Sequence, residues 1–238
     1  MNQLNNKVAY ITGGSKGIGY GIARILLDNG MRVAITSRTL AAASEAATSL
    51  SNDPEKILAL EADVSSMESE RSAIEATVAH FGKLDVLVAN AGVGHFANIE
   101  TLTEQEWKET IDTNLTGVFN SVKAAIAPLK ESKGYIITIA SLAGANFFEK
   151  GAAYNASKFG LVGFSQAIML DLRQFGIKVS TIMPGSVATH FDNHVPGGEK
   201  DAWKIQPEDI GELVADLLKM NPRTLPSKIE VRPSIPGK

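Results

Sequence analysis

The chain has 238 residues, of which 44% are apolar and 21% are charged, a composition typical of a globular protein and not of a disordered or fibrous one. The formal net charge of −3 gives no overall attraction for nucleic acid or an anionic membrane, and the lack of cysteine excludes disulfides, thiolate catalysis and cysteine-bound metals. No apolar stretch approaches the roughly 20 residues that span a bilayer, and the polar first residues do not resemble a signal peptide, so we expect a cytoplasmic protein.

Short β-branched apolar runs alternate with longer segments of helical period, which is typical of βαβ units. The predicted strands are 8–12, 32–36, 57–60, 84–89, 135–140, 177–183 and 229–231. The predicted helices are 18–29, 40–50, 67–81, 104–128, 152–174 and 208–220. Because no linker separates them, the pattern predicts a single α/β domain over residues 1–238, with a doubly wound parallel sheet of seven strands and helices on both faces. Residues 186–206, rich in glycine and polar side chains, are expected to be a mobile segment over a pocket.

A glycine-rich run, TGGSKGIG at residues 12–19, lies where the first predicted strand turns into the first helix. Backbone N–H groups and the positive end of the helix would face an anion there, and glycines let a pyrophosphate approach the backbone closely. The run therefore predicts a dinucleotide-phosphate site formed by Gly13, Ser15, Lys16, Gly17, Ile18 and Gly19. Residues 13–17 also fit the G-x-S-x-G turn of α/β-hydrolases, but that turn follows several strands, whereas one strand precedes it here.

The residues after the second predicted strand indicate which dinucleotide binds. An NAD site of this kind has an acidic residue about 20 positions after the glycine turn, where it binds the ribose hydroxyls. Counting on from Gly17 reaches Ser37, which Arg38 follows, and no carboxylate is nearby in the sequence. Arg38 would bind a 2′-phosphate with paired charge-assisted hydrogen bonds, and Lys16 would add a second positive charge on the same side. We therefore expect NADP(H) as the cofactor, with Ser37 and Arg38 at its ribose.

Two late segments carry residues suited to acid–base chemistry. Tyr154 and Lys158 are four residues apart at the start of a predicted helix, so their side chains share one face. An ammonium held near a phenol favours the phenolate, so we expect the pKa of Tyr154 to be lowered from about 10 towards neutral pH. Ser141 follows the strand 135–140, at the carboxyl end where open α/β sheets place their ligands.

Further short motifs follow the predicted strands in order along the chain. They are Asp63-Val64, Asn90-Ala91-Gly92, Asn114, Ser141, the run from Tyr154 to Lys158, and Pro184-Gly185. Together with the T-G-x-x-x-G-x-G turn, they make the whole sequence resemble the short-chain dehydrogenase/reductase family, and within it the 3-oxoacyl-carrier-protein reductases. Residues 227–238 depart from those reductases because they lack the glycine-rich ending usual there.

The resemblance implies a Rossmann-type fold and an NADP(H)-dependent oxidoreductase that interconverts a ketone and a secondary alcohol. Tyr154 would protonate the carbonyl oxygen as hydride arrives from the nicotinamide, and Ser141 would steady that oxygen. Lys158 would also bind the nicotinamide ribose, and Asn114 would hold a water that relays protons to Lys158. Besides the glycine turn, Ser37, Arg38, Tyr154 and Lys158, the expected cofactor contacts are Asp63, Val64, Asn90, Ala91, Gly92, Pro184, Gly185, Val187 and Thr189.

Apolar residues near the late motifs bear on the substrate. Those expected to wall its pocket are Phe147, Phe148 and Phe191, together with His95 and Phe96. Their apolar character favours a 3-oxoacyl thioester or another lipophilic carbonyl compound as the small-molecule substrate.

The remaining expectations concern metals, partners and an alternative function. His190 and His194 lack a nearby third ligand, so we expect no metal. The predicted helix 152–174 is strongly apolar, and the resemblance implies a homodimer or homotetramer formed through the helices that contain Asn114 and Tyr154. The alternative function is that of a sensor or partner-binding module that binds NADP(H) without turnover, which would not require the four catalytic candidates together.

Overall fold

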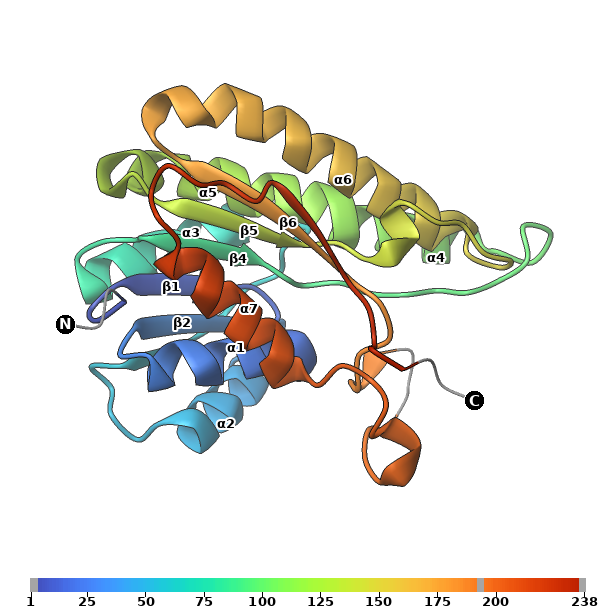
Figure 1. Cartoon of the computed structure of the whole chain (residues 1–238), viewed down its shortest axis with the longest axis horizontal. Coiled ribbons are helices and arrows are strands. Elements are labelled where there is room, and N and C mark those ends of the chain that lie inside the picture. The colour runs from blue at the N-terminus through green and yellow to red at the C-terminus, as the bar shows by residue number, and fades with distance from the viewer. Residues whose placement is uncertain (1–3, 192–194, 236–238) are drawn as a thin grey trace.

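The computed structural model describes residues 4–191 and 195–235. At its centre is a seven-stranded sheet in which every neighbouring pair of strands is parallel, in the order β3-β2-β1-β4-β5-β6-β7 (Figure 1). The strands are β1 (Val8–Ile11), β2 (Arg32–Ser37), β3 (Ile57–Glu61), β4 (Val86–Ala89), β5 (Tyr135–Ile139), β6 (Lys178–Pro184) and β7 (Lys228–Val231). This arrangement confirms the predicted doubly wound α/β sheet of Rossmann type.

Helices cover both faces of the sheet. They are α1 (Gly17–Asp28), α2 (Leu40–Leu50), α3 (Met67–Phe81), α4 (Glu104–Ile111), α5 (Gly117–Ser132), α6 (Ala152–Leu172) and α7 (Pro207–Lys219). One apolar core contains residues of α1, α2 and α7, and a second contains residues of α3, α5 and α6. Strand β1 divides its side chains between them, since Ala9 and Ile11 lie in the first core and Val8 and Tyr10 in the second. This alternation is the period of two that a strand buried on both faces requires.

The sheet reverses its direction of growth between β1 and β4. The chain runs outward from β1 to β2 and β3, and then returns to place β4 on the other side of β1. Open α/β sheets form a crevice at the carboxyl ends of the strands at such a point. All the strand-end motifs of the sequence therefore meet along one edge of the sheet.

The predicted helix 104–128 is interrupted in the structure. Between α4 and α5 lies a single π-helical turn, η1 (Asp112–Thr116), in which the Gly117 N–H donates to the Asp112 carbonyl. A π turn holds one residue more than an α turn, so it changes the direction in which the following side chains point, and such turns occur often at functional sites. Asn114 is at the middle of this turn and is fully buried.

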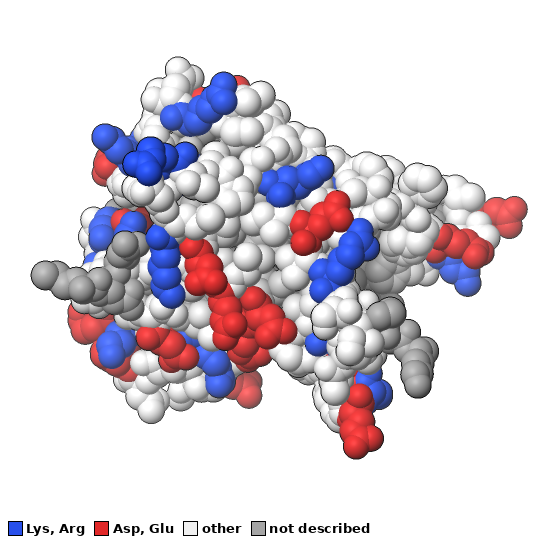
Figure 2. Space-filling model, viewed as in Figure 1, with Lys and Arg blue, Asp and Glu red and all other residues white. Residues whose placement is uncertain are grey.

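No helix in the described part of the chain is long and apolar enough to cross a membrane. Acidic and basic side chains are both distributed over the face in Figure 2, with an acidic group along α7 at its centre. In the segment predicted to be mobile, 186–206, a bridge between Val187 and Ile205 joins the two ends of the segment to each other. Within it, the Asp201 carboxylate accepts from the Gly197 N–H at 2.8 Å and lies 2.7 Å from Lys204 Nζ.

Candidate active site

The glycine turn between β1 and α1 has the shape of an anion cradle. Gly13 has a φ of +64°, a conformation that side-chain-bearing residues rarely adopt, and a Cβ on Gly19 would lie 2.5 Å from both Asn90 Nδ2 and the Gly13 carbonyl oxygen. Helix α1 begins after Lys16 with no side-chain cap and with no acidic residue in its first turn. Its first N–H groups therefore remain available to a phosphate, and the helix end adds a favourable positive potential. The residues of the turn fit the diphosphate of a dinucleotide.

Asn90, at the end of β4, fastens this turn to the neighbouring strand. Its Nδ2 donates to the carbonyl oxygens of Thr12 (2.9 Å) and Gly13 (3.2 Å). In return, the backbone N–H groups of Asn90 and Ala91 both donate to Thr12 Oγ1 at 3.0 Å. The turn is held rigidly at the point where β1 and β4 separate. The amide hydrogens of Asn90 serve the turn itself, so Asn90 shapes the cofactor site through Thr12 and Gly13.

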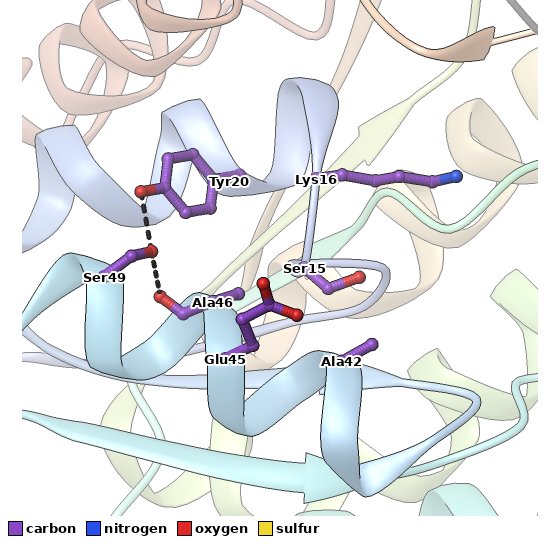
Figure 3. Close-up of a pocket in the computed structure, with 7 residues that line it drawn as sticks. All are labelled: Ser15, Lys16, Tyr20, Ala42, Glu45, Ala46 and Ser49. Carbon is purple, nitrogen blue, oxygen red and sulfur yellow. Dashed lines mark hydrogen bonds between the residues drawn. The ribbon is translucent and has the colours of Figure 1, made fainter.

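A pocket of about 340 Å³ lies beside the turn, between α1 and α2, and Ser15, Lys16, Tyr20 and Glu45 are among the residues that line it (Figure 3). In Figure 3 the Glu45 carboxylate projects from α2 into the pocket, whereas the Lys16 side chain points away from it. None of the described residues that line the pocket is a histidine, so the pocket itself gives Ser15 no imidazole of the kind that a hydrolase uses as its base.

The end of β2 also brings a carboxylate that the spacing in the sequence did not reveal. Ser37 pairs in register with Glu61, the last residue of β3, and Glu61 Oε2 accepts from the Leu40 N–H at 3.0 Å. No carboxylate is near Ser37 and Arg38 in the sequence. In the fold, however, strand pairing places Glu61 beside Ser37, although the two residues are 24 positions apart in the chain. Arg38 itself is exposed and forms no ion pair with the residues that the structure describes.

The catalytic candidates lie in the π turn between α4 and α5, after the end of β5 and at the start of α6. Tyr154 is in the first turn of α6, and its hydroxyl lies near enough to Ser141, which follows β5, for the two side chains to interact. Ser141 Oγ also accepts from the Ala143 N–H at 3.1 Å, which fixes the side chain at the start of a short 3₁₀ turn. The tertiary fold thus joins two hydroxyls that are thirteen residues apart in the sequence.

Lys158 and Asn114 form a second layer beneath the tyrosine. Lys158 is buried, its Nζ donates to the Ile139 carbonyl at 3.1 Å, and it lies 5.7 Å from the centre of the Tyr154 ring. Asn114 exchanges hydrogen bonds with Val93, accepting from its N–H and donating to its carbonyl, both at 2.8 Å, and also donates to Ser157 Oγ at 3.0 Å. Both amide hydrogens of Asn114 are thus used to hold the segment after β4 against α6.

A match over most of the chain, together with this arrangement of side chains, decides the family. A family model described as short chain dehydrogenase matches residues 7–200, and the glycine turn, Ser141 and the Tyr154 to Lys158 run all lie within the match. The chain belongs to the short-chain dehydrogenase family. It is therefore an oxidoreductase.

Relatives and solved structures of this family match over most of the chain. The 3-oxoacyl-[acyl-carrier-protein] reductase of Chlamydia muridarum is 34% identical over 206 residues, which cover 85% of this chain and 83% of that protein. The structure of an alcohol dehydrogenase from the archaeon Thermococcus sibiricus with 5-hydroxy-NADP matches with a TM-score of 0.90 and 31% identity, over 97% of both chains. The 3-ketoacyl-(acyl-carrier-protein) reductase of Brucella melitensis with NADH matches with a TM-score of 0.87 and 28% identity, over 96% of this chain and 97% of that one.

The pKa of Tyr154 in this short-chain dehydrogenase differs from the expectation based on the sequence. Burial raises the pKa of the Tyr154 phenol, and the hydrogen bond from Ser141 only partly offsets the rise. Burial also lowers the pKa of Lys158, from its ordinary 10.5 to about 8. The prediction of a lowered tyrosine pKa is wrong for this state of the enzyme, because the Lys158 ammonium donates to the Ile139 carbonyl instead of the phenol.

The residues expected to wall the substrate pocket divide into two groups. Phe96, Phe148 and Phe191 lie in ring contact with one another or with Tyr154. Phe147 is 85% exposed and lies outside this group, and the nearest polar partner of His95 is Glu109 Oε2 at 3.1 Å. The expectation is therefore wrong for Phe147 as a wall residue, since its side chain turns to solvent, whereas the half-exposed ring of its neighbour Phe148 contacts Phe96.

The segment after β6 closes the other side of the site. The Thr189 side chain lies 3.3 Å from where a Cβ on Gly17 would be, so this segment packs directly on the glycine turn. Pro184 ends β6, and the Gly185 N–H donates to the Val231 carbonyl at 2.8 Å.

Val64 and Asp63 follow β3 on the far side of the site. There, Asn120 Nδ2 donates to the Val64 carbonyl at 2.8 Å, and the Asp63 carboxylate accepts from Ser65.

Two functional positions escaped the sequence reasoning. Asn155 Nδ2 donates to the carbonyls of Ala143 (2.7 Å) and Asn146 (2.8 Å), which holds the segment after Ser141 against α6. Ser157 bonds Asn114, as described above. Both lie inside the Tyr154 to Lys158 run, so that run carried the signal, but only the fold shows what the two inner residues contact. Among the described residues, no group of three or more histidines and carboxylates is placed to hold a metal, and His194 lies outside them.

Proposed function

We propose that this short-chain dehydrogenase is an NADP(H)-dependent enzyme that interconverts a ketone and a secondary alcohol, with Tyr154 as its proton-transfer group. The observation that carries the proposal is that the Tyr154 hydroxyl lies within the influence of Ser141 and beside buried Lys158, at the same sheet edge as the glycine turn. We propose further that residues 1–238 act as one domain and that the enzyme works in the cytoplasm on a small carbonyl compound, such as a 3-oxoacyl thioester or another lipophilic ketone.

The proposed mechanism assigns one task to each polar side chain. A bound NADPH supplies the hydride that reduces the carbonyl carbon. The Tyr154 hydroxyl donates its proton to the carbonyl oxygen, and Ser141 Oγ donates a hydrogen bond to the same oxygen, which holds the substrate in position. Lys158, once protonated, stabilises the phenolate that remains on Tyr154 and reaches towards the nicotinamide ribose. Asn114 positions Val93 and Ser157 around Lys158, and the water relay expected from the family runs along this layer.

The preference for NADP(H) rests on the exposed guanidinium of Arg38, which forms no ion pair with the residues that the structure describes. The matched structures contain an NADP derivative in one case and NADH in another, so the family alone does not select between the two cofactors. Arg38 stands at the end of β2, where the adenosine ribose would lie, and Lys16 begins the neighbouring helix. The carboxylates of Glu45 and Glu61 on the same side oppose a phosphate, so the arginine has to provide the deciding attraction.

Steady-state kinetics with a panel of ketones and secondary alcohols test this function and its cofactor together. We expect turnover with NADPH, and we expect Arg38→Ala to lower the ratio of kcat/KM for NADPH over NADH by roughly 10- to 150-fold, the worth of one charge-assisted pair. Arg71→Ala, which removes an exposed arginine paired with Glu68 on α3, is the control and should leave the ratio unchanged. If no compound in the panel is turned over, the proposed function is refuted. If Arg38→Ala does not change the ratio of kcat/KM for NADPH over NADH, only the role of Arg38 in cofactor selection is refuted.

We also propose a homodimer or homotetramer built on the outer faces of α5 and α6. Leu161 and Leu172, two of the apolar residues of this helix, are buried in the core of the subunit and are not available for this contact. The exposed apolar residues there are Phe119 (45%), Phe159 (43%) and Leu170 (53%). A cluster of large apolar side chains in solvent is typical of an interface.

Light scattering at micromolar concentration tests the assembly. The double variant with Phe119→Glu and Phe159→Glu would bury two uncompensated charges in the interface, so we expect it to have the mass of a monomer. Leu40→Glu, at a 50% exposed position on α2, is the control and should keep the mass of the wild type. A wild-type protein that is itself a monomer would contradict the proposal.

A further inference from the structure

Three phenylalanines from three different loops surround the Tyr154 ring. Phe96 comes from the segment after β4, Phe148 from the segment before α6, and Phe191 from the segment after β6. The centre of the Phe96 ring lies 5.4 Å from that of Tyr154, 5.8 Å from Phe148 and 6.2 Å from Phe191, and the rings of Tyr154 and Phe191 are 5.6 Å apart. We call Phe96, Phe148 and Phe191 the aromatic cluster. The proton-transfer hydroxyl therefore stands beside an apolar wall made of ring faces and edges.

The backbone holds this cluster in place. The Phe148 N–H donates to Asn155 Oδ1 at 3.3 Å, so the residue next to Tyr154 on α6 also positions Phe148. At Gly94, a Cβ would lie 2.5 Å from Cζ of Phe191 and 3.0 Å from Cζ of Phe96, so the two rings fill the space that a side chain would occupy. The rings of Phe96 and Phe191 are thus packed against fixed neighbours, and that of Phe148, which is 47% exposed, covers Phe96 at the outer side, whereas Phe147 is 85% exposed and has no such ring contact with the described residues.

Contacts of this kind favour a particular sort of ligand. Aromatic rings at these distances attract one another through their edges and faces, and a flat apolar group that enters the cluster replaces those contacts with equivalent ones. A polar or charged group would lose its hydration there without gaining a hydrogen bond from the phenylalanines. The part of the substrate next to the carbonyl should therefore be an apolar ring.

The charges of the surrounding loops do not favour a phosphorylated carrier. The segment 90–103 contains Glu100 as its single Asp, Glu, Lys or Arg, and the segment 142–151 contains Glu149 and Lys150, which offset each other. In Figures 1 and 2 the projecting end formed by these two segments is mostly uncoloured, with red and little blue. A carrier arm with phosphate groups would need an excess of cations at this entrance.

We infer that the preferred substrate, within the proposed function on which this inference rests, is an uncharged ketone with an aryl or cycloalkyl group on the carbonyl carbon. The carbonyl oxygen faces Ser141 and Tyr154, and the ring of the substrate packs among the aromatic cluster. Phe96 and Phe148 then determine specificity through the ring they contact, without a part in proton transfer.

The test compares three substrates and matched phenylalanine variants. For the wild type we expect kcat/KM to be highest for acetophenone and at least about 10-fold lower for acetoacetyl-coenzyme A and for butanone. Phe96→Leu and Phe148→Leu should each lower kcat/KM for acetophenone by about 10-fold and change that for butanone far less. Phe147→Leu makes the same chemical change at the neighbouring exposed position and should alter none of the three values.

A binding measurement separates this inference from the proposed function. Ligand-observed NMR gives the Kd of acetophenone without turnover, and we expect Phe148→Leu to raise it by about 10-fold and Phe147→Leu to leave it unchanged. If acetoacetyl-coenzyme A is the better substrate, or if Phe148→Leu does not alter the use or the binding of acetophenone, the inference is overturned and the reductase function stands. If no carbonyl compound is reduced, the function fails and the NMR result decides the inference alone.

Discussion

Tyr154→Phe is expected to lower kcat for ketone reduction by about 100-fold or more and to leave the affinity for the cofactor nearly unchanged. The substitution removes the one hydroxyl that can pass a proton to the carbonyl oxygen and keeps the ring that packs against Phe96 and Phe191. Loss of a positioned general acid typically lowers the rate by about two to four orders of magnitude. Stopped-flow and steady-state assays measure the rate, and calorimetric titration with NADPH measures the affinity.

Tyr135→Phe is the matched control for this experiment. Tyr135 is also buried, and its hydroxyl bonds Ser180 at 2.8 Å in the core, away from the sheet edge where the cofactor would lie. Its loss should reduce stability modestly and leave kcat within about a factor of two, because no proton passes through it. A Tyr154→Phe enzyme that keeps most of its kcat would rule out the proposed proton path.

Lys158→Met is expected to lower kcat by about 100-fold while making the protein more stable at pH 7. The catalytic loss follows from the phenolate on Tyr154, which would form without a neighbouring cation. The gain in stability follows from burial, which lowers the pKa of Lys158 to about 8. This lowering of the pKa corresponds to a destabilisation of the wild type by about 3 kcal/mol. Because the variant also loses the hydrogen bond to Ile139, its gain in stability is smaller by about 1 kcal/mol.

The stability difference between Lys158→Met and the wild type should change with pH in a definite direction. The pKa of Lys158 is lower in the folded state than in the unfolded state, so below about pH 8 the folded protein carries the full cost of a buried charge. That cost disappears as the pH rises from about 8 to the ordinary value of 10.5. The stability advantage of Lys158→Met should therefore be largest at neutral pH and vanish over this range. In the wild type, kcat/KM for reduction should fall as the pH rises through about 8, because the lysine loses its proton.

Urea unfolding of the wild type and the variant at a series of pH values measures the effect. Lys219→Met, at an exposed position on α7, should change the free energy of unfolding by less than about 0.5 kcal/mol at every pH. Equal stability of Lys158→Met and the wild type from pH 7 to pH 10 would show that the pKa of Lys158 is the same in the folded and unfolded proteins, and would contradict this prediction.

The sequence was sufficient for the sheet and for the edge at which the site lies. The alternation of apolar runs and helical periods indicated the strands, and a motif followed each of several strands, so the carboxyl edge of a parallel sheet had to bring them together. The spacing of Tyr154 and Lys158 likewise needed only the geometry of a helix. These features depend on residues close together in the chain, which is why they could be predicted.

Other features depend on neighbours that are distant in the chain. The Glu61 carboxylate approaches the segment after Ser37 because β2 and β3 pair in register, and no count along the chain reveals a pairing between strands. The pKa of Tyr154 depends on burial and on the direction of the Lys158 side chain, both of which are set by the segments packed around α6. The π turn at Asn114 arises within a pattern that is otherwise continuously helical.

The two adjacent phenylalanines show this division most clearly. Sequence reasoning could identify Phe147 and Phe148 as apolar residues near the catalytic motif, but it treated them alike. In the fold, the Phe148 N–H bonds Asn155 and its ring meets Phe96, whereas Phe147 is 85% exposed. Composition and spacing thus indicated the fold class, the sheet edge that carries the candidate site and the candidate catalytic side chains of this protein. Tertiary packing alone decided which side chains face the reacting atoms, because the direction of a loop residue is set by contacts with segments remote in the sequence.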